Sequence, residues 1–180
     1  MKKLLVLALI LGLLAFSCAA ENADFPPEDW FFIGYTYGGV TFPVPGDTQF
    51  YELTPQEQAM GIIVLCFNDD YMLQLRGFAP EALTWEAYRE KVLAEETALV
   101  SYLDEKESIL CVQNTVPDAN TELVGIALNG LDGNLYKVSI FTGADEDFSP
   151  DAAVWEIAQT VAAYTSQMDF STWPLQDAAE

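Results

Sequence analysis

The sequence predicts an α+β domain in which an antiparallel sheet has a helix packed on each face, an α/β/α sandwich. Short strand patterns are separated by turn residues, which is typical of hairpins and hence of antiparallel sheets. Helical patterns occupy Pro80–Leu103 and the stretch that opens at Ser149-Pro150. The segment Gly61–Phe67 is apolar at odd and even positions alike, which indicates a strand covered on both faces.

The strands fall into two groups, one on each side of the first helical pattern. Two short strands, Tyr35–Tyr37 and Val40–Phe42, are expected around a Gly38-Gly39 turn, and Pro43–Asp47 should end this hairpin. Pro55–Ala59 is turn-like. The other strands are expected at Gln49–Leu53, Gly61–Phe67, Tyr71–Phe78, Ser108–Asn114, Glu122–Asn129 and Leu135–Phe141.

The two helices are expected to cover the sheet. The first should span Pro80–Leu103, with Thr84 as a capping residue near its start. The second should begin at Ser149-Pro150, because Ser is a favoured cap and Pro suits the first helical position. Apolar residues recur at helical spacing on one side of each helix. They are Trp85, Tyr88, Val92, Leu99 and Leu103 in the first, and Val154, Ile157, Ala158, Val161 and Met168 in the second.

The first 20 residues predict a signal peptide. Lys2 and Lys3 form a basic start, Leu4–Phe16 is apolar apart from one glycine, and small residues follow, which is the composition of a secretory signal. The apolar run is shorter than the roughly 20 residues that a membrane-spanning helix needs. We therefore expect an exported protein with a signal peptide at 1–20, a tether at 21–29, one acidic α/β domain at 30–173 and a tail at 174–180.

The end of the signal peptide resembles a bacterial lipoprotein signal. In that family the apolar run ends in a Leu-small-small-Cys box, and Ala15-Phe16-Ser17-Cys18 stands at the matching place. Ser17 fits the pattern, whereas Ala15 and Phe16 depart from it. The resemblance implies that Cys18 carries the lipid and holds the protein at the cell surface. Ordinary cleavage after Cys18-Ala19-Ala20 is the alternative, and it implies release as an extracellular protein.

The order of elements from about residue 33 to residue 168 resembles the PsbP/Mog1-like fold. Proteins of that group open with an aromatic strand, a turn and a strand that ends in an F-x-x-P element, which Phe42-Pro43-Val44-Pro45 matches. A helix after the first hairpins, a meander of strands and a closing helix complete the pattern. The resemblance implies a non-catalytic binding, assembly or accessory role, and it supplies no functional residues.

The charge of the chain restricts its partners. Seven Lys and Arg stand against 28 Asp and Glu, for a net charge of −21. Without Lys2 and Lys3 the net charge is −23, because five cations then face the 28 acids. Nucleic acid is excluded as a partner, since phosphate binding needs clusters of Lys and Arg. An acidic domain attracts basic partners, and the only expected membrane attachment is the lipid at Cys18.

The sequence contains no histidine, and this removes most enzyme classes. Catalysis by Ser-His-Asp or Cys-His arrangements loses its base, and a phosphate-binding glycine loop is also missing. We expect no enzyme, no catalytic residue and no cofactor. The predicted function is an exported non-catalytic domain that binds a protein or cell-envelope partner. The alternative is a carboxylate-based hydrolase that acts on a surface glycan, because such an enzyme needs only two acids.

Three acidic clusters could attract calcium but lack the spacing of its ligands. Asp69-Asp70, Asp132-Gly133-Asn134 and Asp145-Glu146-Asp147 are short, and none follows the calcium-loop pattern. The second cluster is better explained as a hairpin turn. We therefore expect no metal site.

Cys66 and Cys111 each lie in an apolar strand pattern, which favours buried free thiols over a disulfide, although export permits one. Of the many aromatic residues, most are expected in the core. Trp30-Phe31-Phe32, ahead of the first hairpin, is the best candidate for an exposed contact.

Overall fold

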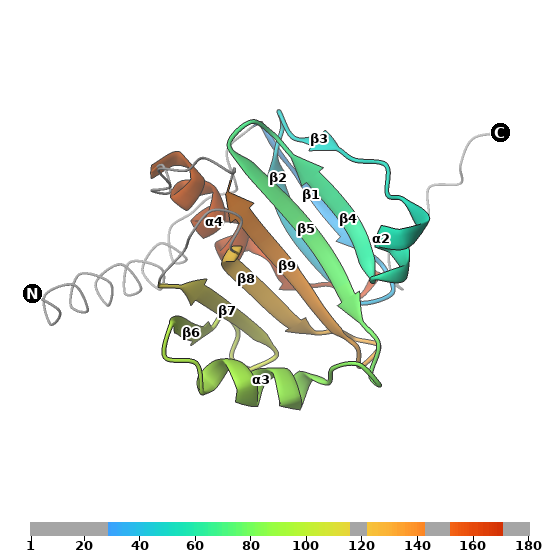
Figure 1. Cartoon of the computed structure of the whole chain (residues 1–180), viewed down its shortest axis with the longest axis vertical. Helices are drawn as coiled ribbons and strands as arrows, with labels where there is room; N and C mark the ends of the chain where they lie inside the picture. Colours follow the sequence, from blue (N-terminus) through green and yellow to red (C-terminus); the bar gives the residue numbers. More distant parts are fainter. Residues whose placement is uncertain (1–28, 116–121, 143–151, 171–180) are drawn as a thin grey trace, which may run out of the picture.

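The computed structural model describes residues 29–115, 122–142 and 152–170 and shows a mixed α+β fold built on two antiparallel sheets (Figure 1). The large sheet has the order β3-β4-β5-β9-β8-β7-β6, and the small sheet has the order β1-β2-β10. The α+β class with an antiparallel sheet is therefore confirmed. The strands are β1 (Trp30–Tyr35), β2 (Val40–Pro45), β3 (Gln49–Phe50), β4 (Ile62–Phe67), β5 (Tyr71–Phe78), β6 (Ala98–Tyr102), β7 (Ile109–Asn114), β8 (Glu122–Asn129), β9 (Leu135–Thr142) and β10 (Ser166–Gln167), and the helices are α2 (Pro55–Ala59), α3 (Trp85–Leu93) and α4 (Ala152–Tyr164).

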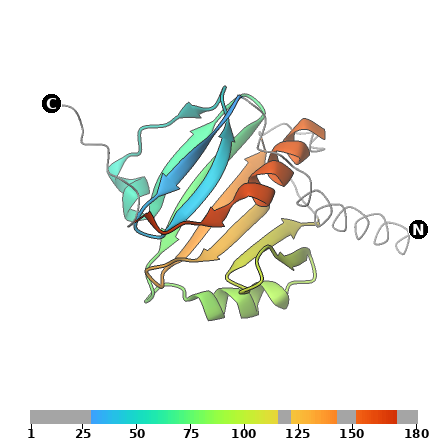
Figure 2. The ribbon, with the colours of Figure 1, turned by 180° about the vertical axis from the view of Figure 1, so that it is seen from behind.

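Two hydrophobic clusters lie on opposite faces of the large sheet. Residues alternate along β7, so that Ile109 and Cys111 join the main cluster while Leu110 and Val112 join the second one. The small sheet and α4 cover the main cluster and lie on one side of the large sheet (Figures 1 and 2). Helix α3 covers the second cluster. The small sheet is an addition to the predicted layers, because the first hairpin does not extend the large sheet but packs on its face.

The helix expected over Pro80–Leu103 is wrong in its second half. Helix α3 is capped by Thr84, as expected, but it ends at Leu93, and Ala98–Tyr102 is a strand that pairs with β7. The segment is rich in strand-forming side chains, and pairing gives its backbone groups partners along β7. Leu99 thus matches the helical spacing without belonging to the helix.

Two further local predictions need correction. Pro55–Ala59, taken as a turn, is the short helix α2, because Thr54 and Glu57 form a reciprocal capping box at its start. Pro43–Pro45, expected to end the first hairpin, continues strand β2 and is buried. Helix α4 buries Val154, Ala158 and Val161 as expected, but it ends before Met168, which is exposed. Its predicted start at Ser149-Pro150 lies outside the described residues.

Strand β4 is less covered than the sequence indicates. Val64 and Leu65 are only half-buried, and Phe67 is exposed. The cause is position, since β4 has only the two-residue strand β3 beyond it, whereas α3 packs against the other end of the sheet. Within the large sheet, strand β8 is buried on both faces, over residues 123–128.

Candidate functional site

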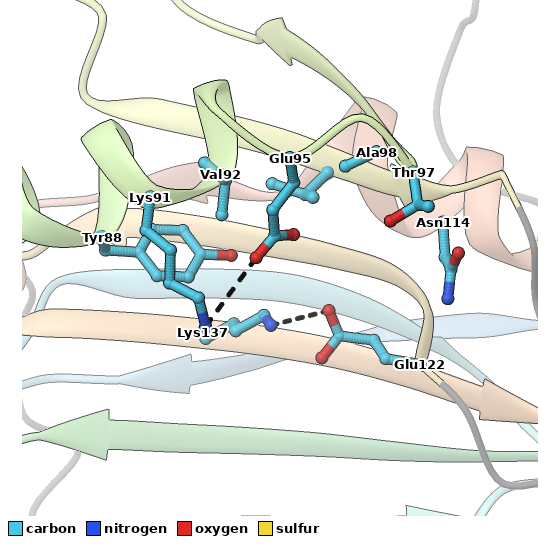
Figure 3. A pocket seen from close by; sticks show the side chains of 10 residues that line it. Tyr88, Lys91, Val92, Glu95, Thr97, Ala98, Asn114, Glu122 and Lys137 are labelled. Atoms are coloured by element: carbon cyan, nitrogen blue, oxygen red, sulfur yellow. Dashed lines mark ion pairs between the residues drawn. The ribbon is translucent and has the colours of Figure 1, made fainter.

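A groove between α3 and the β7–β9 part of the large sheet is the best candidate for a functional site. It has a volume of about 170 Å³ and contains both apolar and charged side chains. Figure 3 shows Tyr88, Lys91 and Val92 of α3 above Glu122 and Lys137 of the sheet. The helix is held there because Trp85, Tyr88 and Val92 pack on apolar residues of β7, β8 and β9.

A half-buried ion pair forms the floor of this groove. The Nζ atom of Lys137 on β9 lies 2.7 Å from Oε1 of Glu122 on β8, and their side chains are 18% and 24% exposed. The pair passes over Gly125, where a Cβ atom would lie 2.5 Å from Cε of Lys137. A glycine at this point of β8 therefore leaves the space that the pair occupies.

A second, solvent-exposed ion pair lies at the mouth of the groove. The Nζ atom of Lys91 is 3.8 Å from Oε1 of Glu95, and the Lys91 side chain is 70% exposed. Such a pair contributes little stability, because both ions stay hydrated. Lys91 and Glu95 are thus available to a molecule that approaches the groove.

The hydroxyl group of Tyr88 is the unusual feature of the groove. Tyr88 is only 5% exposed, and among the described residues its oxygen has no hydrogen-bond partner. Burial, together with the nearby carboxylates of Glu122 and Glu95, raises the pKa of Tyr88, so the group remains a neutral donor. A buried hydroxyl without a partner is costly, and it becomes favourable when an incoming group supplies an acceptor.

The groove holds as many cations as acids in an otherwise acidic molecule. Of the five Lys and Arg in the described residues, Lys91 and Lys137 line the groove, and Arg76 is the cross-strand neighbour of Lys137. The guanidinium carbon of Arg76 lies 4.7 Å from the centre of the Phe78 ring. The buried Nε atom of Arg76 has no hydrogen-bond partner among the described residues. The groove thus presents donors as well as acceptors.

The acidic clusters that the sequence singles out occupy ordinary turns where the structure describes them. Asn68 accepts hydrogen bonds from the backbone of Asp70 and Tyr71, which makes the turn between β4 and β5. Asp132 shapes the hairpin before β9, as expected. Asp145-Glu146-Asp147 lies outside the described residues. Within residues 29–115, 122–142 and 152–170, no group of three or more acids and cysteines is placed to hold a metal ion.

The two cysteines of the domain are free and buried. Three strands, β5, β9 and β8, separate Cys66 on β4 from Cys111 on β7, so their backbones are roughly 19 Å apart. A disulfide needs Cα atoms within about 7 Å, and this excludes a pair. Burial raises the pKa of each thiol to about 12.

The aromatic segment at the start of β1 is partly exposed. Trp30 is half-buried against the main cluster, whereas Phe31 and Phe32 are 38% and 47% exposed. The ring of Phe31 lies 5.9 Å from that of Phe50. No helix among the described residues is long and apolar enough for a membrane span. Cys18 lies outside the described residues.

Sequence reasoning missed the groove. The sequence pattern places Tyr88 on the apolar side of a helix, and it gives no functional role to Lys137 or Glu122. Glu122 and Lys137 are 15 residues apart in the sequence and match no known motif. Only the small number of cations in an acidic chain could have drawn attention to this face.

Comparison with known proteins gives matches among solved structures. No protein-family model and no curated protein matches the sequence. Among solved structures, the chain is similar to the solution structure of cyanobacterial PsbP (CyanoP) from Synechocystis sp. PCC 6803, with 12% sequence identity and a TM-score of 0.49 over 81% of this chain and 96% of that chain. The likeness concerns the fold alone, and no activity, partner or residue role is taken from it.

Proposed function

We propose that this chain is an exported, non-catalytic domain that binds a basic protein partner through the groove between α3 and the sheet. The observation that carries the proposal is the hydroxyl of Tyr88, buried beside the Lys137–Glu122 pair without a hydrogen-bond partner among the described residues. A partner group that accepts this hydrogen bond removes the cost of leaving it unpaired.

The charge of the molecule supports a basic partner. A net charge of −21 attracts a cationic surface over long range and raises the rate of encounter. At the groove itself, Glu95 and Glu122 supply acceptors for basic side chains, and Lys137 on the floor supplies a donor. The net charge of the surface thus attracts the basic partner over long range, and the groove binds its individual side chains.

The geometry of the groove gives no support to the alternative of a glycan hydrolase. Such an enzyme needs one carboxyl group that stays protonated and a second that faces it across the scissile bond. Glu122 and Glu95 each form an ion pair with a lysine, at 2.7 and 3.8 Å, and neither faces a second carboxyl group in these pairs. Binding without catalysis is the simpler role for this arrangement.

Export and surface attachment form the second part of the proposal. The basic start, apolar run and small residues of 1–20 support a signal peptide, and the resemblance of Ala15–Cys18 to a lipoprotein box supports lipid attachment at Cys18. A tether at 21–29 would then hold the acidic domain at the cell surface, where the groove faces other envelope proteins.

Photo-crosslinking in the native cell envelope tests the groove. A photoreactive amino acid in place of the exposed Lys91, at the mouth, should give one crosslinked protein, and the same substitution at the exposed Lys106 serves as the control. The yield of the crosslink from position 91 should fall clearly when Tyr88→Phe is added. Equal crosslinking from both positions, or a crosslink that Tyr88→Phe leaves unchanged, would contradict the proposal.

A further inference from the structure

A second cleft, of about 330 Å³, lies at the end of the large sheet where β5 ends and β9 begins. It shares no lining residue with the groove. We call it the tyrosine cleft, and its side chains include those of Tyr35 on β1, Gln58 on α2, Ile63 on β4, Phe78 on β5, Asn134 in the turn before β9 and Tyr136 on β9. Four stretches of the chain thus converge on one small space.

Tyr136 forms a rigid wall of the tyrosine cleft. Its hydroxyl donates a hydrogen bond to Oδ2 of Asp132 at 2.7 Å. Its ring is also enclosed by glycines, since a Cβ atom at Gly38, Gly77 or Gly130 would lie between 2.4 and 3.1 Å from ring atoms. The three glycines leave the space that the ring occupies, and the hydrogen bond to Asp132 orients it, so this wall needs little ordering when a ligand arrives.

Tyr35 supplies a second aromatic surface that a ligand can reach. Its ring lies 5.5 Å from the ring of Tyr136 and 5.7 Å from that of Tyr37, with tilted planes in both cases. Tyr35 is half-buried, whereas Tyr37 is 77% exposed. Contact on two sides holds Tyr35 in place while part of its ring stays open to the cleft.

Besides the two tyrosines, the polar side chains of the cleft are uncharged amides. Gln58 lies on the exposed short helix α2, and the Asn134 amide is oriented by a 2.8 Å hydrogen bond from its Nδ2 to Oδ2 of Asp132. An amide side chain can both donate and accept hydrogen bonds. None of the described residues that line the cleft carries a charge.

We propose that the tyrosine cleft binds an uncharged saccharide. The apolar C–H face of a sugar ring would pack on Tyr35, and its hydroxyl groups would exchange hydrogen bonds with Gln58 and Asn134. A sugar hydroxyl both donates and accepts, as these amides do, whereas a proline-rich peptide has few donors to offer. The net charge of −21 disfavours acidic saccharides.

NMR titration of the labelled domain with neutral tetrasaccharides tests the inference. Cellotetraose, chitotetraose and maltotetraose serve as ligands, and at least one should shift the side-chain amide signals of Gln58 and Asn134. Tyr35→Ala should weaken binding at least tenfold, and Tyr35→Phe should keep it, because the ring face remains. Tyr51→Ala, which removes an exposed tyrosine outside the cleft, is the matched control and should bind normally.

Two further measurements keep the test decisive. If Tyr35→Ala proves unstable, Gln58→Ala replaces it as the test. Because Gln58 is exposed, this substitution should weaken binding without affecting the fold. The affinity should not change between low and high salt, which separates this site from the charged groove. The inference is overturned if none of the tetrasaccharides binds, if Tyr35→Ala and Gln58→Ala bind normally, or if a proline-rich peptide or polygalacturonate binds the cleft in their place.

Discussion

The Nζ atom of Lys137 and the Oε1 atom of Glu122 lie 2.7 Å apart on neighbouring strands, and both side chains are partly exposed. This contact exists because of an irregularity in β8. The register between β8 and β9 shifts between Glu122 and Val124, and the extra residue turns Glu122 toward the face that carries Lys137. With a regular register, Glu122 would point into the main cluster with Val124.

The first prediction is that Lys137→Met destabilises the domain. Its loss leaves the half-buried Glu122 carboxylate without a partner, and we expect a decrease of about 1–2 kcal/mol in the free energy of unfolding, since the pair keeps some contact with solvent. The double variant Lys137→Met/Glu122→Gln should recover part of this loss. Urea unfolding measures both, and a double variant less stable than the single one would contradict the explanation.

The second prediction concerns the thiols. Cys66 and Cys111 are 0% and 4% exposed, and burial raises the pKa of each to about 12. The folded domain should therefore react very slowly with a thiol reagent at neutral pH, and two thiols should react at once in denaturant. Fast reaction of either thiol in the native protein would show that its strand opens to solvent.

The third prediction concerns acid stability. Burial by itself raises the pKa of Asp132. The hydrogen bonds from Tyr136 and Asn134 outweigh this effect and hold the pKa of Asp132 below its ordinary value. The carboxylate then stabilises the fold above roughly pH 4, and this contribution is lost as the pH falls through the lowered pKa. Between about pH 6 and pH 3, the melting temperature of Asp132→Asn should fall less than that of the wild type. Parallel melting curves for the two proteins would rule out this role of Asp132.

The sequence predicted strands best where turns are marked by specific residues. Strands β5 and β8 coincide with the expected Tyr71–Phe78 and Glu122–Asn129, because a side-chain-bonded turn at Asn68 sets the start of β5 and the acidic hairpin follows β8. The prediction for Ala98–Tyr102 was wrong because leucine spacing alone does not distinguish a helix from an alternating strand. The groove could not be predicted, since it depends on the shift in register at Glu122, which no local pattern encodes.

The fourth prediction tests attachment of the protein to the membrane. If Cys18 carries a lipid, Cys18→Ser should move the protein from the membrane fraction to the medium. A matched Ser17→Ala variant, which keeps a small residue before the cysteine, should remain attached. Membrane association that persists in Cys18→Ser would exclude a lipid anchor at this residue, while leaving the groove and the tyrosine cleft unaffected.

The fifth prediction addresses the central claim, that the groove beside Tyr88 binds a partner. Tyr88→Phe removes only the buried, unpaired hydroxyl, so the free energy of unfolding should be unchanged or slightly higher. The affinity for the protein captured by crosslinking should nevertheless fall about tenfold, the value of one hydrogen bond. The deciding measurement is a calorimetric titration of that partner into wild-type and Tyr88→Phe protein, paired with their melting curves. Weaker binding with undiminished stability supports the account, and equal binding by the two proteins contradicts it.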